Sequence, residues 1–252
     1  MTEQICISKK IKPYNKVLKI EGDKSLSIRW ALLASQAYGK SKSLNLLKSE
    51  DVISTLNCLK KLGVKIKISK NSCEIHGNGL NNFKYNKKIT LDAGNSGTLG
   101  RLIMGLLVHS KVNIKIKGDK SLSKRDFLRV TKPLKKFGAN FKTNSGKLPI
   151  EIKGTNFPKP IKYFENKGSA QCKSSVMLAA LNTNGTTVIK AKKSRDHTEL
   201  LFKYLNLPIK IKKTNEYDLI KIKGKNKIKN INYKIPSDIS SSAFFIVLTI
   251  LS

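Results

Sequence analysis

Apolar and polar positions alternate with two different periods along this chain of 252 residues. In residues 64–68 they alternate one by one, which is typical of a strand, whereas in residues 51–62 the apolar residues recur at helical spacing. Asp51 begins the second run and Gly63 follows it, and these residue types suit the two ends of a helix. Because strand-like and helix-like runs alternate over the whole chain, we predict an α/β fold.

These runs recur in a fixed order. Turns rich in glycine or serine, each followed by an apolar run, begin at Gly22, Gly94, Gly168 and Ser237. Their spacing is nearly constant, at roughly 70 residues, and self-similarity at one period indicates repeated units. Each interval predicts a βαβαββ unit. We expect residues 1–21 to form a strand of another lobe, 22–236 to form a lobe of three such units, and 237–252 to begin a fourth unit in a sequence truncated at its C-terminus.

Within the units, the polar turns are predicted to be loops that lead into helices. Helices are expected over the apolar runs 30–38, 102–108, 127–137, 176–181, 200–205 and 243–251. The alternating positions of the first 20 residues predict a strand, with its clearest part at 16–20.

The charge of the chain is large but mostly uninformative. The formal net charge is +34 and the isoelectric point is about 10.1, values typical of proteins that bind nucleic acid or a membrane surface. Most of the cations are lysines scattered among isoleucine and asparagine, so we interpret them as a solvated face set by composition. Arginine binds carboxylate or phosphate with a bidentate fork, and four of the five arginines lie in the polar turns. The arginines are Arg29, Arg101, Arg125, Arg129 and Arg195.

The cysteine and hydropathy patterns exclude several other classes. The cysteines form no CxxC pair and no histidine stands at metal-ligand spacing from them, so we expect reduced thiols and no metal site. The N-terminus lacks the apolar core of a signal peptide, and the longest apolar run, Ala243–Leu251, is too short to cross a bilayer. We therefore expect a cytoplasmic protein. The cysteines are Cys6, Cys58, Cys73 and Cys172.

The hexapeptide Gly-Asp-Lys-Ser-Leu-Ser stands at 22–27 and again at 118–123. At the start of a helix, the backbone N–H groups and the helix dipole favour an anion, and Lys and Arg neutralise it. The sequence lacks the spacing of a P-loop, because Asp23 precedes Lys24, and the GxxG at 94–97 follows a strand, which is the wrong context for a KH module. One such turn alone is more often a helix N-cap than a binding site. Three turns in phase with the repeat, with arginines beside them, indicate one convergent anion site.

Six stretches of the sequence also carry a family resemblance. They are GDKSLSIR, LDAGNSGTLGRL, GDKSLSKRDFLRV, SAQCKSSVMLAAL, SRDHTE and PSDISSSAFF. In order and in spacing they resemble the 5-enolpyruvylshikimate-3-phosphate synthase (3-phosphoshikimate 1-carboxyvinyltransferase) family, in its glyphosate-insensitive bacterial type, over essentially the whole chain. The resemblance implies transfer of the enolpyruvyl group of phosphoenolpyruvate to the 5-hydroxyl of shikimate 3-phosphate, with release of phosphate, in chorismate and aromatic amino-acid biosynthesis. It implies neither a metal nor a redox cofactor.

Carried over motif by motif, the resemblance implies roles for residues of all the polar turns. Lys24 would be the catalytic contact to both substrates. Shikimate 3-phosphate would be held by Lys24, Ser25, Arg29, Ser169, Ala170, Gln171, Ser194 and Arg195. Phosphoenolpyruvate would be held by Lys24, Asn95, Gly97, Thr98, Arg101, Arg125 and Gln171. The expected partners are these two small molecules, bound by a monomer with no membrane partner and no specific nucleic-acid partner.

Two departures from the family pattern qualify these expectations. Asp126 stands where the family has proline, and its carboxylate would weaken the hold of Arg125 on a phosphate. In the family, the general acid and base carboxylates belong to the second lobe, which we expect beyond residue 252. We therefore expect these 252 residues alone to fold without turning over substrate.

The remaining acids and histidines near the turns have simpler interpretations. Glu199 and Asp238 are interpreted as helix N-terminal residues rather than general bases. His76 and His109 are interpreted as structural. For His197, which lies in a predicted substrate turn, a structural role and a ligand contact both stay open.

Two alternative functions are weighed against this resemblance. The related UDP-N-acetylglucosamine enolpyruvyl transferases carry a reactive cysteine in a loop of the second unit, and residues 111–125 contain no cysteine. A basic nucleic-acid-binding repeat protein would bind DNA in a salt-sensitive way without responding to a sugar phosphate.

Overall fold

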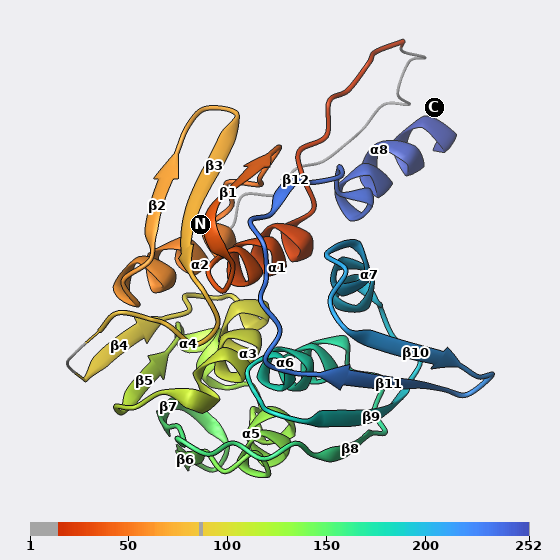
Figure 1. The fold of residues 1–252 in the computed structure, drawn as a ribbon. Coiled ribbons are helices and arrows are strands. Elements are labelled where there is room, and N and C mark those ends of the chain that lie inside the picture. Colours follow the sequence, from red (N-terminus) through yellow and green to blue (C-terminus); the bar gives the residue numbers. More distant parts are fainter. Residues whose placement is uncertain (1–14, 86–87, 252) are drawn as a thin grey trace.

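In the computed structural model, which describes residues 15–85 and 88–251, three four-stranded sheets are arranged around central helices (Figure 1). The first sheet contains β1 (Tyr38–Leu44), β2 (Lys65–Ile68), β3 (Ser72–Asn78) and β12 (Asn232–Lys234). The second contains β4 (Ile89–Asp92), β5 (Ile114–Lys117), β6 (Asn140–Asn144) and β7 (Lys147–Lys153). The third contains β8 (Lys162–Glu165), β9 (Thr186–Lys192), β10 (Ile209–Lys213) and β11 (Tyr217–Lys223).

The three sheets share one topology. Their strand orders are β12-β1-β3-β2, β4-β5-β7-β6 and β8-β9-β11-β10. In each sheet the first two strands are parallel and the other pairings are antiparallel. The α/β class and the repeated units predicted from the sequence are confirmed.

Many of the lysines lie at the exposed positions of the strands. Along β7 buried positions alternate with more exposed ones, so that Ile150 and Ile152 face the core while Lys147 and Lys153 face solvent. The same alternation places Ile220 and Ile222 of β11 inside and Lys221 outside. In these two strands, lysine therefore lies on the outer face of a sheet whose inner face carries isoleucine.

The central layer consists of α1 (Lys24–Ala34), α3 (Gly97–Leu106) and α6 (Ala170–Leu181). Every residue of α3 is buried, and α1 and α6 are buried from Ser27 and Cys172 onward. Helices that are buried all round tolerate small and apolar residues on every side, which fits their Ala, Gly and Leu content. The other helices are α2 (Glu50–Lys61), the buried η1 (Leu107–His109), α4 (Lys120–Ser123), α5 (Leu128–Lys135), α7 (His197–Tyr204) and α8 (Ile239–Leu251).

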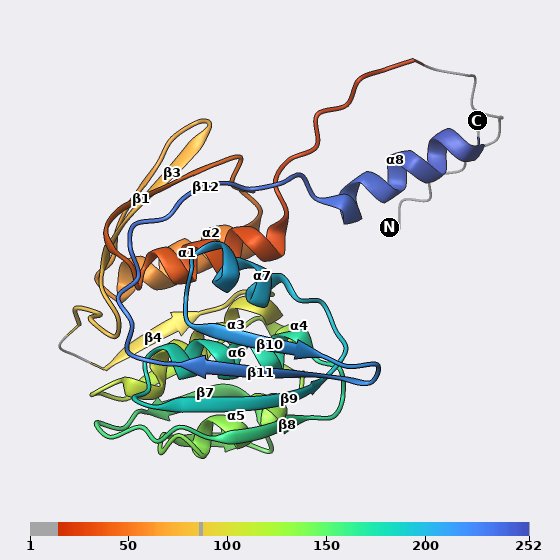
Figure 2. The same cartoon turned by 45° about the vertical axis from the view of Figure 1, so that its right-hand side comes forward.

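The first sheet is completed by a strand from the far end of the chain. β12 pairs in parallel with β1, so that Lys42 lies opposite Asn232 and Leu44 opposite Lys234 (Figure 2). The strand predicted at 16–20 is wrong, because these residues are in no strand, and the preceding residues 1–14 lie outside the described part. Nearby, Gly22 forms only an isolated bridge, with Ser237.

The helices begin earlier than their apolar runs predict. The prediction that the turns at 22–29, 94–101 and 168–175 are loops is wrong, because α1, α3 and α6 already begin inside them. A side chain before each start, from Asp23, Ser96 or Ser169, accepts a hydrogen bond from a backbone N–H of the first turn. The helix predicted to extend to residue 38 is also too long, since α1 ends at Ala34.

The last helix differs from all others. α8 stands away from the three sheets in both views, and none of its described residues is buried (Figures 1 and 2). Its exposed side chains include Phe244, Val247 and Ile250. A helix with this many apolar side chains normally lies in a core. No helix in the described part of the chain has the length and apolarity needed to span a membrane.

Candidate functional site

The first turns of four helices converge on one pocket of about 430 Å³. Ser25 of α1, Thr98 of α3, Gln171 of α6 and His197 of α7 all belong to its lining. The complete lining is Ser25, Arg29, Thr98, Gly168, Ser169, Ala170, Gln171, Ser194, Arg195 and His197. Because free N–H groups and the positive end of each helix dipole face the same space, the pocket is suited to an anion.

The turns that form the pocket are fixed by side-chain caps. Asp23 Oδ1 accepts from the Leu26 N–H at 2.7 Å, and Ser96 and Ser169 accept from N–H groups three residues ahead at 3.2 and 3.3 Å. The carboxylate of the buried Glu165 accepts from the Ser169 N–H at 2.8 Å, which fixes the turn before α6. These bonds determine where each helix starts and therefore what the pocket contains.

Arg29 is the buried cation of the pocket, with only 5% of its surface exposed. Its Nε donates to Thr198 Oγ1 at 2.8 Å, one terminal nitrogen to the Ser25 carbonyl at 3.1 Å, and the other to Ser174 Oγ at 3.3 Å. A guanidinium has five N–H donors, so one on each terminal nitrogen remains for a ligand. Burial lowers the pKa of Arg29 to about 10, and the charge of Glu199 opposes this effect. The Arg29 guanidinium is therefore a fixed, charged fork, with one N–H group on each terminal nitrogen still without a partner among the described residues.

A second group of cations lies at the start of α3. A Cβ at Gly97 would lie only 2.8 Å from a terminal nitrogen of Arg101 and 3.3 Å from one of Arg125, so both guanidinium groups lie beside this glycine. Arg101 donates to Gln171 Oε1 at 2.7 Å, and Gln171 Nε2 donates to Thr98 Oγ1 at 3.0 Å. Gln171 thereby joins α3 to α6. It also connects the residues Gly97, Arg101 and Arg125, called the Gly97 group below, to the pocket.

Two residues expected at the site lie differently. Lys24 is outside the pocket lining, and its ammonium forms an ion pair of 3.1 Å with Asp51 at the start of α2. Asn95 donates to Asp119 Oδ2 at 2.5 Å, at the second copy of the hexapeptide. The other residues assigned from the resemblance fall into the pocket or the Gly97 group, and Ser194 Oγ in the pocket wall has no hydrogen-bond partner among the described residues.

Comparison with known proteins explains this constellation. Residues 8–252 match the family model of EPSP synthase (3-phosphoshikimate 1-carboxyvinyltransferase). The chain belongs to the EPSP synthase family. It is 44% identical over 242 residues to the 3-phosphoshikimate 1-carboxyvinyltransferase of Ruthia magnifica, an alignment that covers 94% of this chain and 54% of the relative. It is 41% identical over 236 residues to the enzyme of the same name from Caldicellulosiruptor saccharolyticus, covering 92% and 54%.

The EPSP synthase fold is also found among solved structures. The EPSP synthase of Acinetobacter baumannii superposes with a TM-score of 0.83 at 36% identity, covering 91% of this chain and 52% of that chain. The chain thus spans about half the length of the EPSP synthases that it matches.

Several residues around this pocket give no separate signal in the sequence. Lys173 and Glu199 form a buried ion pair with a Nζ–Oε1 distance of 2.5 Å. Lys173 is one lysine in a lysine-rich chain, and Glu199 has the position of an ordinary first-turn acid in α7. The charge of Arg129, in the first turn of α5, lowers the pKa of Arg101 together with burial, which is the larger effect. Only the three-dimensional arrangement relates these residues to the site.

The two other histidines and the described cysteines lie apart from the pocket lining. His109 is buried, and burial lowers its pKa to about 4, whereas His76 is exposed on β3. The thiols of Cys58, Cys73 and Cys172 are free and buried, and burial raises the pKa of Cys58 and Cys73 to about 11. Cys6 lies outside the described residues.

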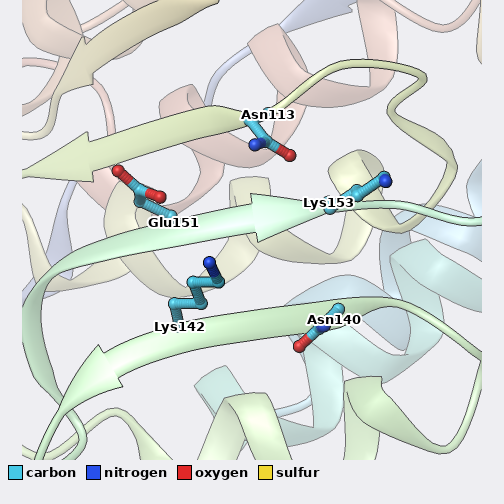
Figure 3. A pocket seen from close by; sticks show the side chains of 5 residues that line it. All are labelled: Asn113, Asn140, Lys142, Glu151 and Lys153. Atoms are coloured by element: carbon cyan, nitrogen blue, oxygen red, sulfur yellow. The ribbon is translucent and has the colours of Figure 1, made fainter.

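Another hollow, of about 280 Å³, lies on the outer face of the second sheet (Figure 3). It is lined by Asn113, Asn140, Lys142, Glu151 and Lys153. These side chains stand on neighbouring strands rather than at helix starts, and Glu151 lies 3.4 Å from Lys88 in an exposed ion pair. Since its single carboxylate is already paired with lysine, this hollow has the character of a solvated sheet face.

Proposed function

We propose that this chain supplies the shikimate 3-phosphate site and part of the phosphoenolpyruvate site of an enolpyruvyl transferase. The reaction moves the enolpyruvyl group of phosphoenolpyruvate to the 5-hydroxyl of shikimate 3-phosphate and releases phosphate, as a step of chorismate and aromatic amino-acid biosynthesis. Both substrates are phosphorylated carboxylates. Fixed cations and helix N-termini stabilise their charge and the charge that develops in the transition state.

The observation that carries the proposal is the buried fork of Arg29 among four helix N-termini. Its two remaining N–H groups suit a bidentate contact to a phosphate or carboxylate of shikimate 3-phosphate. Ser25, with Ser169, Ala170 and Gln171, would hold the same ligand through hydroxyl, backbone and amide groups of the first turns. Ser194 and Arg195 would close the pocket on the side of α7.

The Gly97 group supports a neighbouring position for phosphoenolpyruvate. Arg101 and Arg125 lie close enough to the start of α3 to bind one anion together with the backbone N–H groups of that helix. Asn95 and Thr98 would shape this position. Gln171 contacts both groups of residues and would reach both substrates. Lys24, now paired with Asp51, would contact both substrates after turning from that carboxylate.

Asp126, which stands where the family has proline, forms hydrogen bonds of its own in the structure. One oxygen of its carboxylate accepts from the Leu128 N–H at 2.7 Å, at the start of α5, and its carbonyl accepts from Arg101 at 3.5 Å. We infer that this carboxylate stabilises the start of α5 rather than pairing with Arg125. Its effect on the binding of phosphate by Arg125 is then smaller than its position in the sequence suggests.

The proposed domain organisation follows from the same chain. Residues 22–236 would form the substrate-binding lobe, and 1–21 and 237–252 would belong to a second lobe that supplies the general acid and base. The exposed apolar surface of α8 supports this assignment, because it needs a core that the three sheets do not provide. We further propose that the protein is a cytoplasmic monomer.

Titration with shikimate 3-phosphate tests the proposal directly. Trp30 is fully buried beside Arg29, and its Nε1 donates to the Ile231 carbonyl at 3.3 Å, so its fluorescence should respond to occupation of the pocket. We expect saturable binding by the 252-residue chain that shikimate alone does not reproduce. Arg29→Gln should weaken it at least tenfold, because a charge-assisted bidentate contact is lost.

The matched control is Lys40→Gln, which removes an exposed lysine of β1 from the outer face of the first sheet and should leave the affinity unchanged. Filter binding of DNA provides the opposite test. Salt-sensitive DNA binding by a chain that does not respond to shikimate 3-phosphate would refute the proposed function. Release of the phosphate of phosphoenolpyruvate by the purified chain in the presence of shikimate 3-phosphate would refute the need for a second lobe.

A further inference from the structure

The ion pair of Lys173 and Glu199 is the most deeply buried pair of charges that the structure describes. The side chain of Lys173 is 0% exposed and that of Glu199 is 3% exposed, and their charged atoms have no hydrogen-bond partner outside the pair among the described residues. Taking two such charges out of water costs more than their mutual attraction commonly returns, so burial of a bare pair is weak evidence for a role in stability. A different role is therefore worth examining.

The two residues of the pair are the sequence neighbours of the residues that bind Arg29. Lys173 precedes Ser174 in α6, and Glu199 follows Thr198 in α7. Ser174 and Thr198 are the two hydroxyls that accept from the Arg29 guanidinium, and they are 2.7 Å apart. The cation and the anion therefore belong to the same two helices, at adjacent positions, as the hydroxyls that hold the arginine in place.

Glu199 is the carboxylate that acts most strongly on Arg29. Among the charges around that guanidinium, which also include Asp23 and Arg195, Glu199 has the largest effect, and it supports the charged form against burial. A carboxylate in this position is a natural bidentate partner for the two N–H groups that Arg29 has left. An internal partner of this kind would compete with an anionic substrate.

We propose that Lys173 is a positioning residue that binds the Glu199 carboxylate and thereby keeps both remaining N–H groups of Arg29 free for substrate. Lys173 need not touch the substrate for this role. Lys173 determines which of two anions, the Glu199 carboxylate or the bound ligand, accepts hydrogen bonds from the two remaining N–H groups of Arg29. The proposal rests on the assignment of Arg29 to shikimate 3-phosphate, but its first consequence is observable without any ligand.

Arginine Nε–H signals in a ¹⁵N NMR spectrum provide the ligand-free test. The chain has five arginines, so the spectrum is simple, and the Arg29 signal can be assigned from its loss in Arg29→Lys. Lys173→Met should shift the Arg29 signal as Glu199 turns to the guanidinium. Adding Glu199→Gln to Lys173→Met should return the signal toward its original position, and Lys173→Arg should leave it there.

Affinity for shikimate 3-phosphate provides the second test. Lys173→Met should weaken binding at least tenfold, and the double variant Lys173→Met with Glu199→Gln should return it to within about threefold of the unmodified chain. Glu199→Gln alone should bind within the same threefold range, since it removes the competing carboxylate and leaves both remaining N–H groups of Arg29 free for the ligand. The matched control is Lys213→Met, which removes the exposed Lys213–Asp196 pair of 3.5 Å at the start of α7 and should change neither readout.

The outcomes separate this inference from the proposed function. An Arg29 signal that does not move in Lys173→Met refutes the inference even if shikimate 3-phosphate binds. A tenfold loss of affinity in Glu199→Gln also refutes it, because the carboxylate itself would then be required. Movement and recovery of the signal in a chain that never binds the ligand would uphold the inference about Arg29 and refute the proposed function. If Lys173→Met does not fold, Glu199→Gln and the double variant still decide the question.

Discussion

The two copies of the hexapeptide Gly-Asp-Lys-Ser-Leu-Ser form the same cap and then diverge. In the first copy Asp23 accepts from the Leu26 N–H at 2.7 Å, and in the second Asp119 accepts from the Leu122 N–H at 2.6 Å. The first copy opens α1, which continues for 11 residues into the centre of the lobe. The second opens α4, which ends after 4 residues near the surface.

The residues after the hexapeptide account for this difference. Ile28 is fully buried, and Arg29 after it is held by three hydrogen bonds. The corresponding Lys124 and Arg125 are exposed. A shared sequence thus specifies a shared helix start, while the next residue decides whether the helix enters the core. As a result, one arginine is a rigid fork and the other remains open to solvent.

Truncation at the two divergent positions should produce the largest difference. Ile28→Ala should lower the free energy of unfolding by about 3 kcal/mol, because it removes a fully buried side chain and leaves a cavity. Lys124→Ala should change it by less than about 0.5 kcal/mol, as is usual for an exposed position. Chemical denaturation of both variants measures the contrast. Equal losses would mean that burial at residue 28 does not distinguish the two copies.

The charged residues of the two copies should differ in catalysis. In a form of the protein with the full length of its relatives, Lys24→Ala or Arg125→Ala should each lower kcat/KM by about two orders of magnitude or more, or about 2.7 kcal/mol. Each variant removes a charged contact to a substrate. Lys120→Ala is the matched control, because this exposed lysine has the place of Lys24 in the second copy.

Steady-state kinetics with both substrates varied give these values. Lys120→Ala should remain within about threefold of the unmodified enzyme, since no contact of Lys120 connects it to the pocket or the Gly97 group among the described residues. Losses below about threefold for Lys24→Ala and Arg125→Ala would show that the hexapeptide copies are structural.

The copies also show what the sequence could and could not predict. The repeat, the α/β class and the three polar turns follow from spacing and residue type, and the structure brings most of the expected residues together. The helix starts were placed too late because the first turns are polar and interrupt the apolar period. The pairing of β12 with β1 was missed because it joins segments about 190 residues apart through a strand that is 3 residues long.

The missed residues of the site have a similar explanation. Lys173 stands in a lysine-rich chain, so its type carries no signal until its burial is known. Lys24 lies in the first turn of α1, where the sequence predicts a loop, and the ion pair that it forms with Asp51 depends on the neighbouring α2. Side-chain partners from different units are the part of the site that the sequence leaves open.

Removal of the two caps should have a smaller effect than these changes. Asp23→Ala should destabilise the protein by about 1 kcal/mol, which is typical for loss of an N-cap side chain. Asp119→Ala should destabilise the protein by less than Asp23→Ala, because α4 is short and its cap lies at the surface. Chemical denaturation of both variants measures the difference. Asp23→Asn is the control, since asparagine caps a helix as well as aspartate. A larger loss for Asp119→Ala would reverse the ranking of the two copies.

The smallest expected effect concerns the titration of His197, which lines the pocket beside the arginine of the first copy. Burial lowers its pKa, and the charges of Arg29 and Arg195 lower it further. A bound anion offsets these cations and raises the pKa of His197, so the protein takes up a proton on binding. As the pH falls from about 8 to about 6, affinity for shikimate 3-phosphate should therefore increase by about threefold more in the unmodified chain than in His197→Gln. The ionisation of the ligand itself is the same for both proteins.

Isothermal titration calorimetry in two buffers of different ionisation enthalpy measures the proton uptake. Equal uptake in both proteins would show that His197 does not sense the anion, and that the fork of Arg29 acts without a titrating neighbour.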